Sequence, residues 1–276
     1  MRHKIQLLST IISNGYVIGF FQGKIYSGNL KMACVPGLNC YSCPGAIGSC
    51  PIGSLQSALA GREKNVPYFI IGILLFLGIM MGRLVCGFLC PFGFFQDLLY
   101  KVKIKKRKIN TNIDKKLRFL KYIVLVLFVI ILPVVIVDST GLGEPMFCKW
   151  LCPAGTFEAG IPLIITNPTL RYTLGFIFSF KMLILLSIII LSMIVYRPFC
   201  KYLCPLGAFY GMFNKLSFYQ MKVDFNKCNG CKECVKTCKM GVDVLKNINS
   251  AECIRCGDCK TACNQNAITS GLNIKK

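Results

Sequence analysis

Apolar stretches of bilayer length alternate along the chain with basic or cysteine-rich segments. A helix needs about 20 predominantly apolar residues to cross the hydrocarbon core of a bilayer. We predict four membrane spans, at about residues 5–21, 67–89, 117–137 and 176–196. Ser13-Asn14-Gly15 interrupts the first span. Pro133 lies within the third, where neighbouring helices can satisfy the carbonyl it frees.

The two ends of the chain differ from this pattern. A basic start precedes the first span and would also suit a signal peptide, but the polar interruption and the lack of an Ala-x-Ala site argue against cleavage. Apolarity drops after Tyr219, where a separate soluble module begins. The predicted fold is therefore mainly α, a four-helix transmembrane bundle over residues 1–219 built as two pseudo-repeats, followed by a cytoplasmic α+β domain over residues 220–276.

Charge orients the predicted spans. The chain has 276 residues, 54% of them hydrophobic, and a formal net charge of +22, which suits a membrane protein better than a soluble domain. Basic residues crowd residues 101–121, with Asp114 as the single acid, and such a loop marks the cytoplasmic side. Residues 138–171 hold few basic residues and should face outward. Because the basic residues flank apolar spans, lipid topology explains them better than nucleic acid, and we expect no nucleic-acid partner.

A short cysteine motif recurs along the chain. The unit is Cys-x3-Cys-Pro-x-Gly, and three complete copies begin at Cys86, Cys148 and Cys200. A partial copy surrounds Cys50-Pro51, with its first cysteine displaced upstream to Cys43. Two copies match over a longer run, since Arg83 and Lys101 flank one as Arg197 and Lys215 flank the other, which indicates an internal duplication.

The spacing of this unit has a physical interpretation. Cysteines four apart on a helix project from one face, so both can reach one metal centre. Proline holds the preceding cysteine in extended geometry and suits the first turn of a new helix. Each unit should place one cysteine at the end of a helix and the other at the start of the next, where free N–H groups favour a negatively charged thiolate or cluster.

The predicted topology sorts these cysteines into two four-cysteine sites. An inner site would take Cys86, Cys90, Cys200 and Cys204. An outer site would take Cys43, Cys50, Cys148 and Cys152. Cys34 and Cys40 lie on the outer side too, and an outer-face disulfide between them is as plausible as ligation.

The C-terminal domain contains a doubled cysteine spacing, Cys-x2-Cys-x2-Cys-x3-Cys, that is typical of bacterial ferredoxins with two [4Fe–4S] clusters. The fourth cysteine of each run serves the other cluster. One cluster would take Cys228, Cys231, Cys234 and Cys263. The other would take Cys253, Cys256, Cys259 and Cys238. Lys239 and Asn264 stand where a proline usually follows, and two all-cysteine zinc sites are the weaker alternative.

The chain has eighteen cysteines but a single histidine, His3. This composition excludes haem held by two histidines and disfavours mixed Cys/His zinc sites. Disulfide frameworks suit small secreted domains, which this chain is not. Iron–sulfur clusters at the Cys-x3-Cys-Pro units, one or two in addition to the two in the C-terminal domain, fit the cysteine count best.

The combination of transmembrane helices, Cys-x3-Cys-Pro loops and a C-terminal double ferredoxin motif resembles the NapH/NosR/CcoG-type membrane polyferredoxins. The resemblance covers nearly the whole chain. It implies a multi-pass electron-transfer protein of the cell membrane with a cytoplasmic ferredoxin domain, acting as the electron-transfer component of an oxidoreductase system.

The functional hypothesis is an electron conduit from a cytoplasmic donor, through the inner site, to an acceptor at or beyond the outer face. Residues 220–276 hold ten basic against five acidic residues, which suits an acidic donor such as ferredoxin or flavodoxin. The bilayer core is ~30 Å thick. Either the sites lie deep in the membrane, or a quinone, a flavin or a partner redox subunit bridges them.

Two other functions remain open at this point. The membrane cysteines could form a thiol–disulfide relay, which would leave only the two ferredoxin clusters. The outer cysteines could instead handle copper, as the resemblance to CcoG suggests, because soft thiolates select Cu(I). Counting iron and acid-labile sulfide separates the relay from the conduit.

Overall fold

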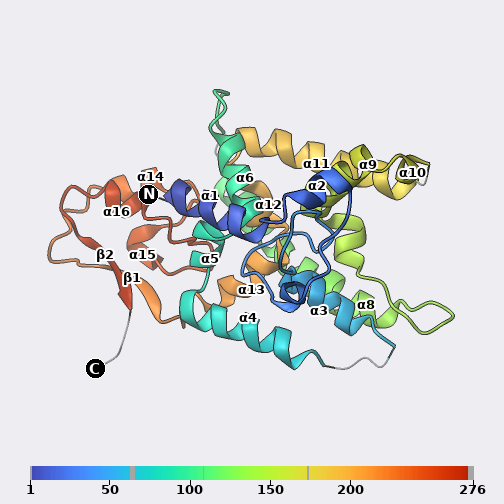
Figure 1. Cartoon of the computed structure of the whole chain (residues 1–276). Coiled ribbons are helices and arrows are strands. Elements are labelled where there is room, and N and C mark those ends of the chain that lie inside the picture. The colour runs from blue at the N-terminus through green and yellow to red at the C-terminus, as the bar shows by residue number, and fades with distance from the viewer. Residues whose placement is uncertain (1, 63–65, 108, 173, 273–276) are drawn as a thin grey trace.

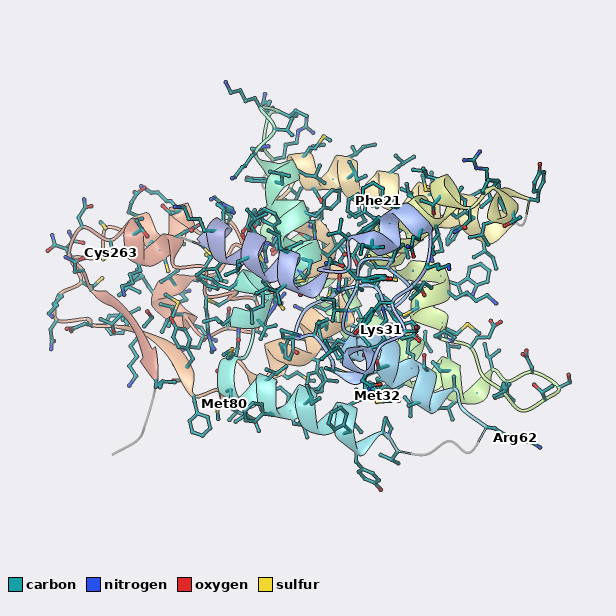
Figure 2. The ribbon with its side chains drawn as sticks, in the orientation of Figure 1. Phe21, Lys31, Met32, Arg62, Met80 and Cys263 are labelled. Atoms are coloured by element: carbon teal, nitrogen blue, oxygen red, sulfur yellow. The ribbon has the colours of Figure 1, made fainter. Side chains whose placement is uncertain are left out.

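The structure, a computed structural model, describes residues 2–62, 66–107, 109–172 and 174–272. Most of this part of the chain is helical, and the C-terminal strands and helices form one end of the molecule (Figure 1). Helices α4 (Tyr68–Met81) and α11 (Phe176–Ile194) run lengthwise along the rest. Cys263, in the C-terminal domain, lies at the end opposite Arg62 (Figure 2).

Among the described residues, two continuous helices are long and apolar enough to cross a membrane. One is α11, and the other covers Asn112–Val135 by joining α7 (Thr111–Ile123), the π-helix η2 (Val124–Ile131) and α8 (Leu132–Val135). Only 17% and 28% of their most apolar windows are buried, so most of their apolar side chains are at least partly exposed at the surface of the protein. These helices correspond to the fourth and third predicted spans.

The first two predicted spans are interrupted, so the structure does not contain four continuous spanning helices. The segment 5–21 is divided into α1 (Arg2–Ser13) and α2 (Ile18–Gln22), because the polar run at Asn14-Gly15 ends the first helix. Helix α4 ends at Gly82, whose φ of 51° is unfavourable for other residues, and α5 (Leu84–Phe88) follows. The 14 residues of α4 reach about 21 Å at 1.5 Å per residue.

A first short helix precedes Cys34, and the other short helices carry or follow the Cys-Pro segments. They are η1 (Asn29–Met32), α3 (Pro51–Leu59), α6 (Pro91–Tyr100), η3 (Phe147–Leu151), η4 (Gly155–Gly160), α9 (Ile161–Thr166), α10 (Pro168–Arg171), α12 (Pro198–Tyr202) and α13 (Pro205–Phe213). Their cysteines belong to the same buried core as Phe92, Phe199 and Leu206. The core of the molecule is therefore built around the cysteine motif.

The C-terminal domain has the expected α+β composition. Strands β1 (Tyr219–Val223) and β2 (Ile268–Leu272) pair antiparallel, with Tyr219 opposite Leu272. Helices α14 (Glu233–Thr237), α15 (Val244–Asn247) and α16 (Asp258–Thr261) lie between them in sequence. The first strand begins one residue before the predicted boundary at residue 220.

This domain is firmly attached to the helical part. Glu252 accepts from Arg83 at 3.0 Å and from Lys121 at 2.5 Å, and Arg255 donates to the Met81 carbonyl at 2.7 Å. Burial alone would raise the pKa of the Glu252 carboxyl, but the charges of Arg83 and Lys121 outweigh burial and leave that pKa lowered. The carboxylate thus stays ionised between two buried cations.

Candidate metal centres

Four cysteines that precede proline adopt the geometry expected from the motif. Cys50, Cys90, Cys152 and Cys204 all have extended backbones, with ψ between 107° and 128°. Proline then occupies the first turn of α3, α6 and α13. The sulfurs of Cys90 and Cys204 each accept the N–H of a glycine in that first turn, Gly93 or Gly207, at 3.4 Å. These sulfurs therefore lie at helix N-termini, where negative charge is favoured.

The structure brings the four cysteines of the predicted inner site together. All are at most 6% exposed and belong to one core, and Cys204 interacts electrostatically with the other three. Two buried arginines cross between the repeats: Arg83 donates to the Cys200 carbonyl at 2.9 Å, and Arg197 donates to the Cys86 carbonyl at 2.6 Å. The duplication in the sequence thus becomes a reciprocal pair of contacts around one site.

The glycine of the motif makes room for these arginines. A Cβ on Gly93 would lie 3.2 Å from Arg197 Nη1, and a Cβ on Gly207 would lie 3.2 Å from Arg83 Nη2. The same atoms would crowd the carbonyls of Cys86 and Cys200 at 3.1 and 3.2 Å. The repeated glycine therefore avoids crowding of the arginines and carbonyls around the inner site.

Two buried glutamines also contact the cysteines, and the motif analysis missed them. Gln96 Nε2 donates to the Cys200 sulfur at 3.1 Å, and its Oε1 accepts the Phe199 N–H at 3.2 Å. Gln56 Nε2 donates to the Cys148 sulfur at 3.3 Å, and its Oε1 accepts the Phe147 N–H at 2.9 Å. The signal was the longer pattern Cys-Pro-x-Gly-x-x-Gln, which follows Cys50 and Cys90.

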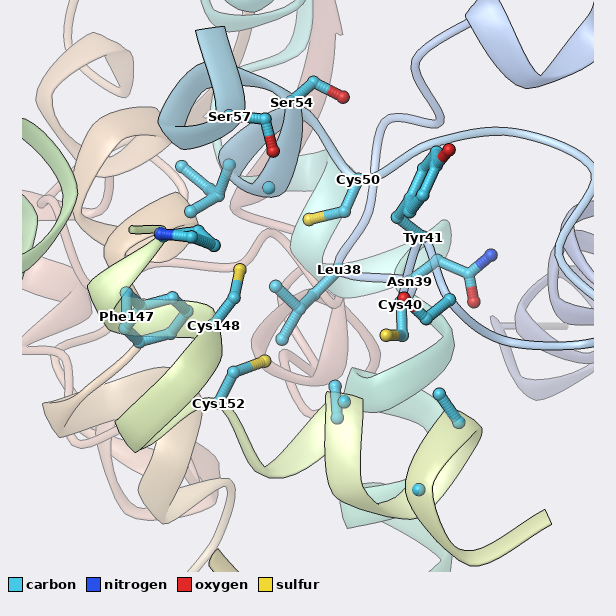
Figure 3. A pocket seen from close by; sticks show the side chains of 18 of the residues that line it. Leu38, Asn39, Cys40, Tyr41, Cys50, Ser54, Ser57, Phe147, Cys148 and Cys152 are labelled. Carbon is cyan, nitrogen blue, oxygen red and sulfur yellow. The ribbon is translucent and has the colours of Figure 1, made fainter. Parts of the chain in front are cut away.

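A cavity of about 710 Å³, which we call the outer cavity, is lined by residues of α3, η3, η4 and α9. Helices α3 and α9 lie away from the C-terminal end of the molecule (Figure 1). Four of its lining residues are Cys40, Cys50, Cys148 and Cys152. Their sulfurs are arranged around the Leu38 side chain (Figure 3). Burial raises the pKa of the Cys148 thiol to about 12, so binding a metal as thiolate must release protons.

The outer cavity is lined by three of the four cysteines of the predicted outer site, and by Cys40 where the prediction has Cys43. The Cys43 side chain is 1% exposed, and its sulfur donates to Asn14 Oδ1 at 3.5 Å. Cys40 is held at the cavity by its own N–H, which donates to Glu158 Oε2 at 2.6 Å. Burial raises the pKa of the Glu158 carboxyl to about 8.

The structure also bears on the two alternatives for Cys34 and Cys40, a disulfide or ligation. All eighteen cysteines fall within the described residues, and each is a free thiol. Cys34 lies 3.8 Å from the Ser49 hydroxyl, whereas Cys40 lines the outer cavity. The two cysteines therefore have different surroundings.

In the C-terminal domain the structure brings together both sets that the spacing predicted. A cavity of about 130 Å³ is lined by Cys228, Cys231, Cys234 and Cys263. A second, of about 20 Å³, is lined by Cys238, Cys253, Cys256 and Cys259. The fourth cysteine of each run thus reaches the other cavity. Within the described residues, no three or more His, Cys, Asp or Glu side chains form a group suited to a single metal ion.

Fold and sites together define a class of protein, in which a ferredoxin-type module is attached to apolar helices with buried Cys-Pro sites. The family model described as "4Fe-4S binding domain" matches residues 66–110, 125–161 and 180–225, and each segment holds one complete cysteine unit. The chain belongs to this family of ferredoxin-type 4Fe-4S membrane electron-transport proteins.

Individual relatives support this assignment. The chain is 33% identical to the uncharacterized protein MJ0750 of Methanocaldococcus jannaschii, over 74% of this chain and 78% of that protein. It is 24% identical to the ferredoxin-type protein NapH of Haemophilus influenzae, over 94% of this chain and 84% of that protein. It is 27% identical to the methylamine utilization ferredoxin-type protein MauN of Paracoccus denitrificans, over 74% of this chain and 66% of that protein. No solved structure gives a significant match.

Proposed function

We propose that this iron–sulfur protein carries electrons from a reduced cytoplasmic donor, through its C-terminal domain and the inner site, to an acceptor reached from the outer cavity. The observation that carries the proposal is the order of the four cysteine sites. In Figure 1 the helices α14 and α16, which carry ferredoxin-type cysteines, lie at one end, α5, α6 and α12 of the inner site follow, and α3 of the outer cavity lies further on. An electron that enters at the C-terminal domain meets the sites in that sequence.

The contact between the C-terminal domain and the inner site supports this order. Ile254, between Cys253 and Cys256, is buried, and a Cβ on Gly87 would lie only 2.3 Å from its carbonyl oxygen. Gly87 directly follows Cys86 of the inner site. Arg83 also reaches from the inner site to the Ala251 carbonyl at 2.6 Å. Backbone contacts thus join one ferredoxin-type cavity to the inner site.

The residues at each site suit a [4Fe–4S] cluster. Each of the four sites offers four cysteines, and a bound cluster supplies one-electron chemistry there. The protein's own groups set the environment: Gln96 and Gln56 donate to sulfurs, and glycine N–H groups do so at Cys90 and Cys204. Such hydrogen bonds to sulfur, together with burial, tune reduction potentials. In this proposal Cys40 replaces Cys43 as the fourth ligand of the outer site.

The proposal includes a membrane orientation. The basic residues between α6 and α7 support an orientation with that loop and the C-terminal domain in the cytoplasm, and the outer cavity towards the opposite face. Several basic side chains of the C-terminal domain are exposed, as Lys236 is, and they would steer an acidic soluble donor. Helices α11 and Asn112–Val135 would cross the bilayer, and the shorter α4 and the segment of α1 and α2 would make the other two passes.

Substitution of one inner ligand tests the proposal. Cys200→Ser should remove the inner cluster's spectral signal and block electron transfer to the outer face, while both C-terminal clusters stay reducible. Cys34→Ser is the matched control and should change neither, because Cys34 lines none of the four sites. Unchanged iron, sulfide and electron flow in Cys200→Ser would refute the inner site. Unchanged iron with lost disulfide exchange would favour a thiol relay instead.

A further inference from the structure

The short segment of residues 36–39 lies between the inner site and the outer cavity. Gly37 sits so close to the inner site that a Cβ placed on it would be 2.7 Å from the Cys90 Cα and 3.1 Å from the Leu89 carbonyl oxygen. The next residue, Leu38, is 2% exposed, and its side chain lines the outer cavity among the cysteines (Figure 3). Two consecutive residues therefore touch two different sites.

The residues that follow continue along the outer cavity. Asn39 and Cys40 line it together with Leu38 and Cys50. The chain therefore passes from the inner site to the outer cavity within the four residues 37–40.

The segment is held in place from the inner side. The Tyr210 side chain is fully buried, and its hydroxyl donates to the Pro36 carbonyl at 3.0 Å. Tyr210 is the sixth residue after Cys204, the position that Gln56 and Gln96 occupy in their units. Glu158, at the same position after Cys152, holds the Cys40 N–H at the other end of the segment. Equivalent positions of two repeats therefore clamp both ends.

We propose that residues 36–39 form the electron-transfer contact between the inner site and the outer cavity, so that no further cofactor is needed to join them. The inference rests on the proposed function. In the step, one electron leaves the reduced cluster at the inner site, which becomes oxidised, and enters the cluster at the outer cavity, which becomes reduced. No bond is formed or broken and no proton moves. The backbone of Gly37 beside Cys90 and the Leu38 residue in the outer cavity supply the path.

The test compares three variants of the full-length protein. Gly37→Ala forces the segment away from Cys90, and Tyr210→Phe releases Pro36 while keeping the ring. Gly72→Ala is the control, because a Cβ on Gly72 of α4 would meet nothing within 4 Å. Two quantities are measured: the magnetic coupling between the reduced inner and outer clusters by EPR, and the rise of the outer signal after flash photoreduction. Iron and sulfide content is determined for each variant.

Gly37→Ala and Tyr210→Phe should retain their iron, show weaker coupling and slow the outer signal severalfold, whereas Gly72→Ala should match the wild type. Unchanged coupling and rate in Gly37→Ala with full iron would overturn the inference. If Gly37→Ala loses the inner cluster, Tyr210→Phe decides: weaker coupling supports the contact, and unchanged coupling overturns it. A wild-type protein without clusters at the inner and outer sites would instead refute the proposed function itself.

Discussion

At the scale of single residues, Cys40 and Cys43 differ in what surrounds their sulfurs. Cys40 lines the outer cavity, whereas Cys43 is buried against Asn14. We expect Cys40→Ser to lose one cluster, about four iron atoms per chain, and Cys43→Ser to keep them. Iron and sulfide analysis of the two purified variants makes the comparison. Loss of iron in Cys43→Ser alone would restore the ligand set first predicted from the motif.

Gln96 gives a second prediction at this scale. Replacing Gln96 with Leu removes a donor to the Cys200 sulfur and an acceptor for Phe199. Loss of a hydrogen bond to sulfur destabilises the more negative, reduced cluster, so the inner potential should shift downward. Gln56→Leu should shift the outer potential instead. Redox titration followed by EPR reports both, and a shift of the same signal in both variants would contradict the assignment of the glutamines to separate sites.

Some of these residues were accessible from sequence and others were not. The ferredoxin-type sets followed from spacing, because each run of cysteines is local and its ligand exchange is characteristic. The choice between Cys40 and Cys43 depends on how the loop from Gly23 to Cys50 folds against Glu158, a residue far away in sequence. Periodicity carries no information about such a contact. The Cys-Pro-x-Gly-x-x-Gln pattern is visible in the sequence, but only the structure shows that its glutamine donates to a cysteine sulfur.

At the scale of elements, hydropathy predicted the positions of the apolar segments more accurately than the bounds of the helices within them. It gave α11 and Asn112–Val135 closely, because these helices are continuous. It counted residues 5–21 as one span although Ser13-Asn14-Gly15 interrupts them, and it missed the end of α4 at Gly82, where the chain turns to present Cys86. The second apolar segment is therefore interrupted just before Cys86, where the chain reaches the inner site.

The prediction at this scale concerns the membrane topology of the helices. Reporters fused at residue 110 or 270 should be cytoplasmic, and reporters at residue 60 or 165 should be exoplasmic, because the basic loop between α6 and α7 is retained inside. Cysteine accessibility or paired reporter enzymes measure this. An exoplasmic reporter at residue 270 would reverse the placement of every site.

At the scale of the whole molecule, the buried contact of Glu252 with Arg83 and Lys121 joins the C-terminal domain to the helices. Removing one partner of a buried ion pair typically costs about 3–5 kcal/mol. We expect Glu252→Gln to weaken docking and slow reduction of the inner cluster. Glu233→Gln is the control, since its exposed pair with Lys236 is worth about 0–1 kcal/mol. Equal unfolding free energies and transfer rates in the two variants would contradict this role.

The number of clusters in the intact protein tests the central claim most directly. Four four-cysteine sites predict about sixteen iron atoms and as many acid-labile sulfides per chain when each holds a [4Fe–4S] cluster. The measurement is iron and sulfide content of the full-length protein, purified without oxygen. About eight of each would mean that only the C-terminal domain binds clusters. That result would contradict an iron–sulfur path through the inner site and the outer cavity.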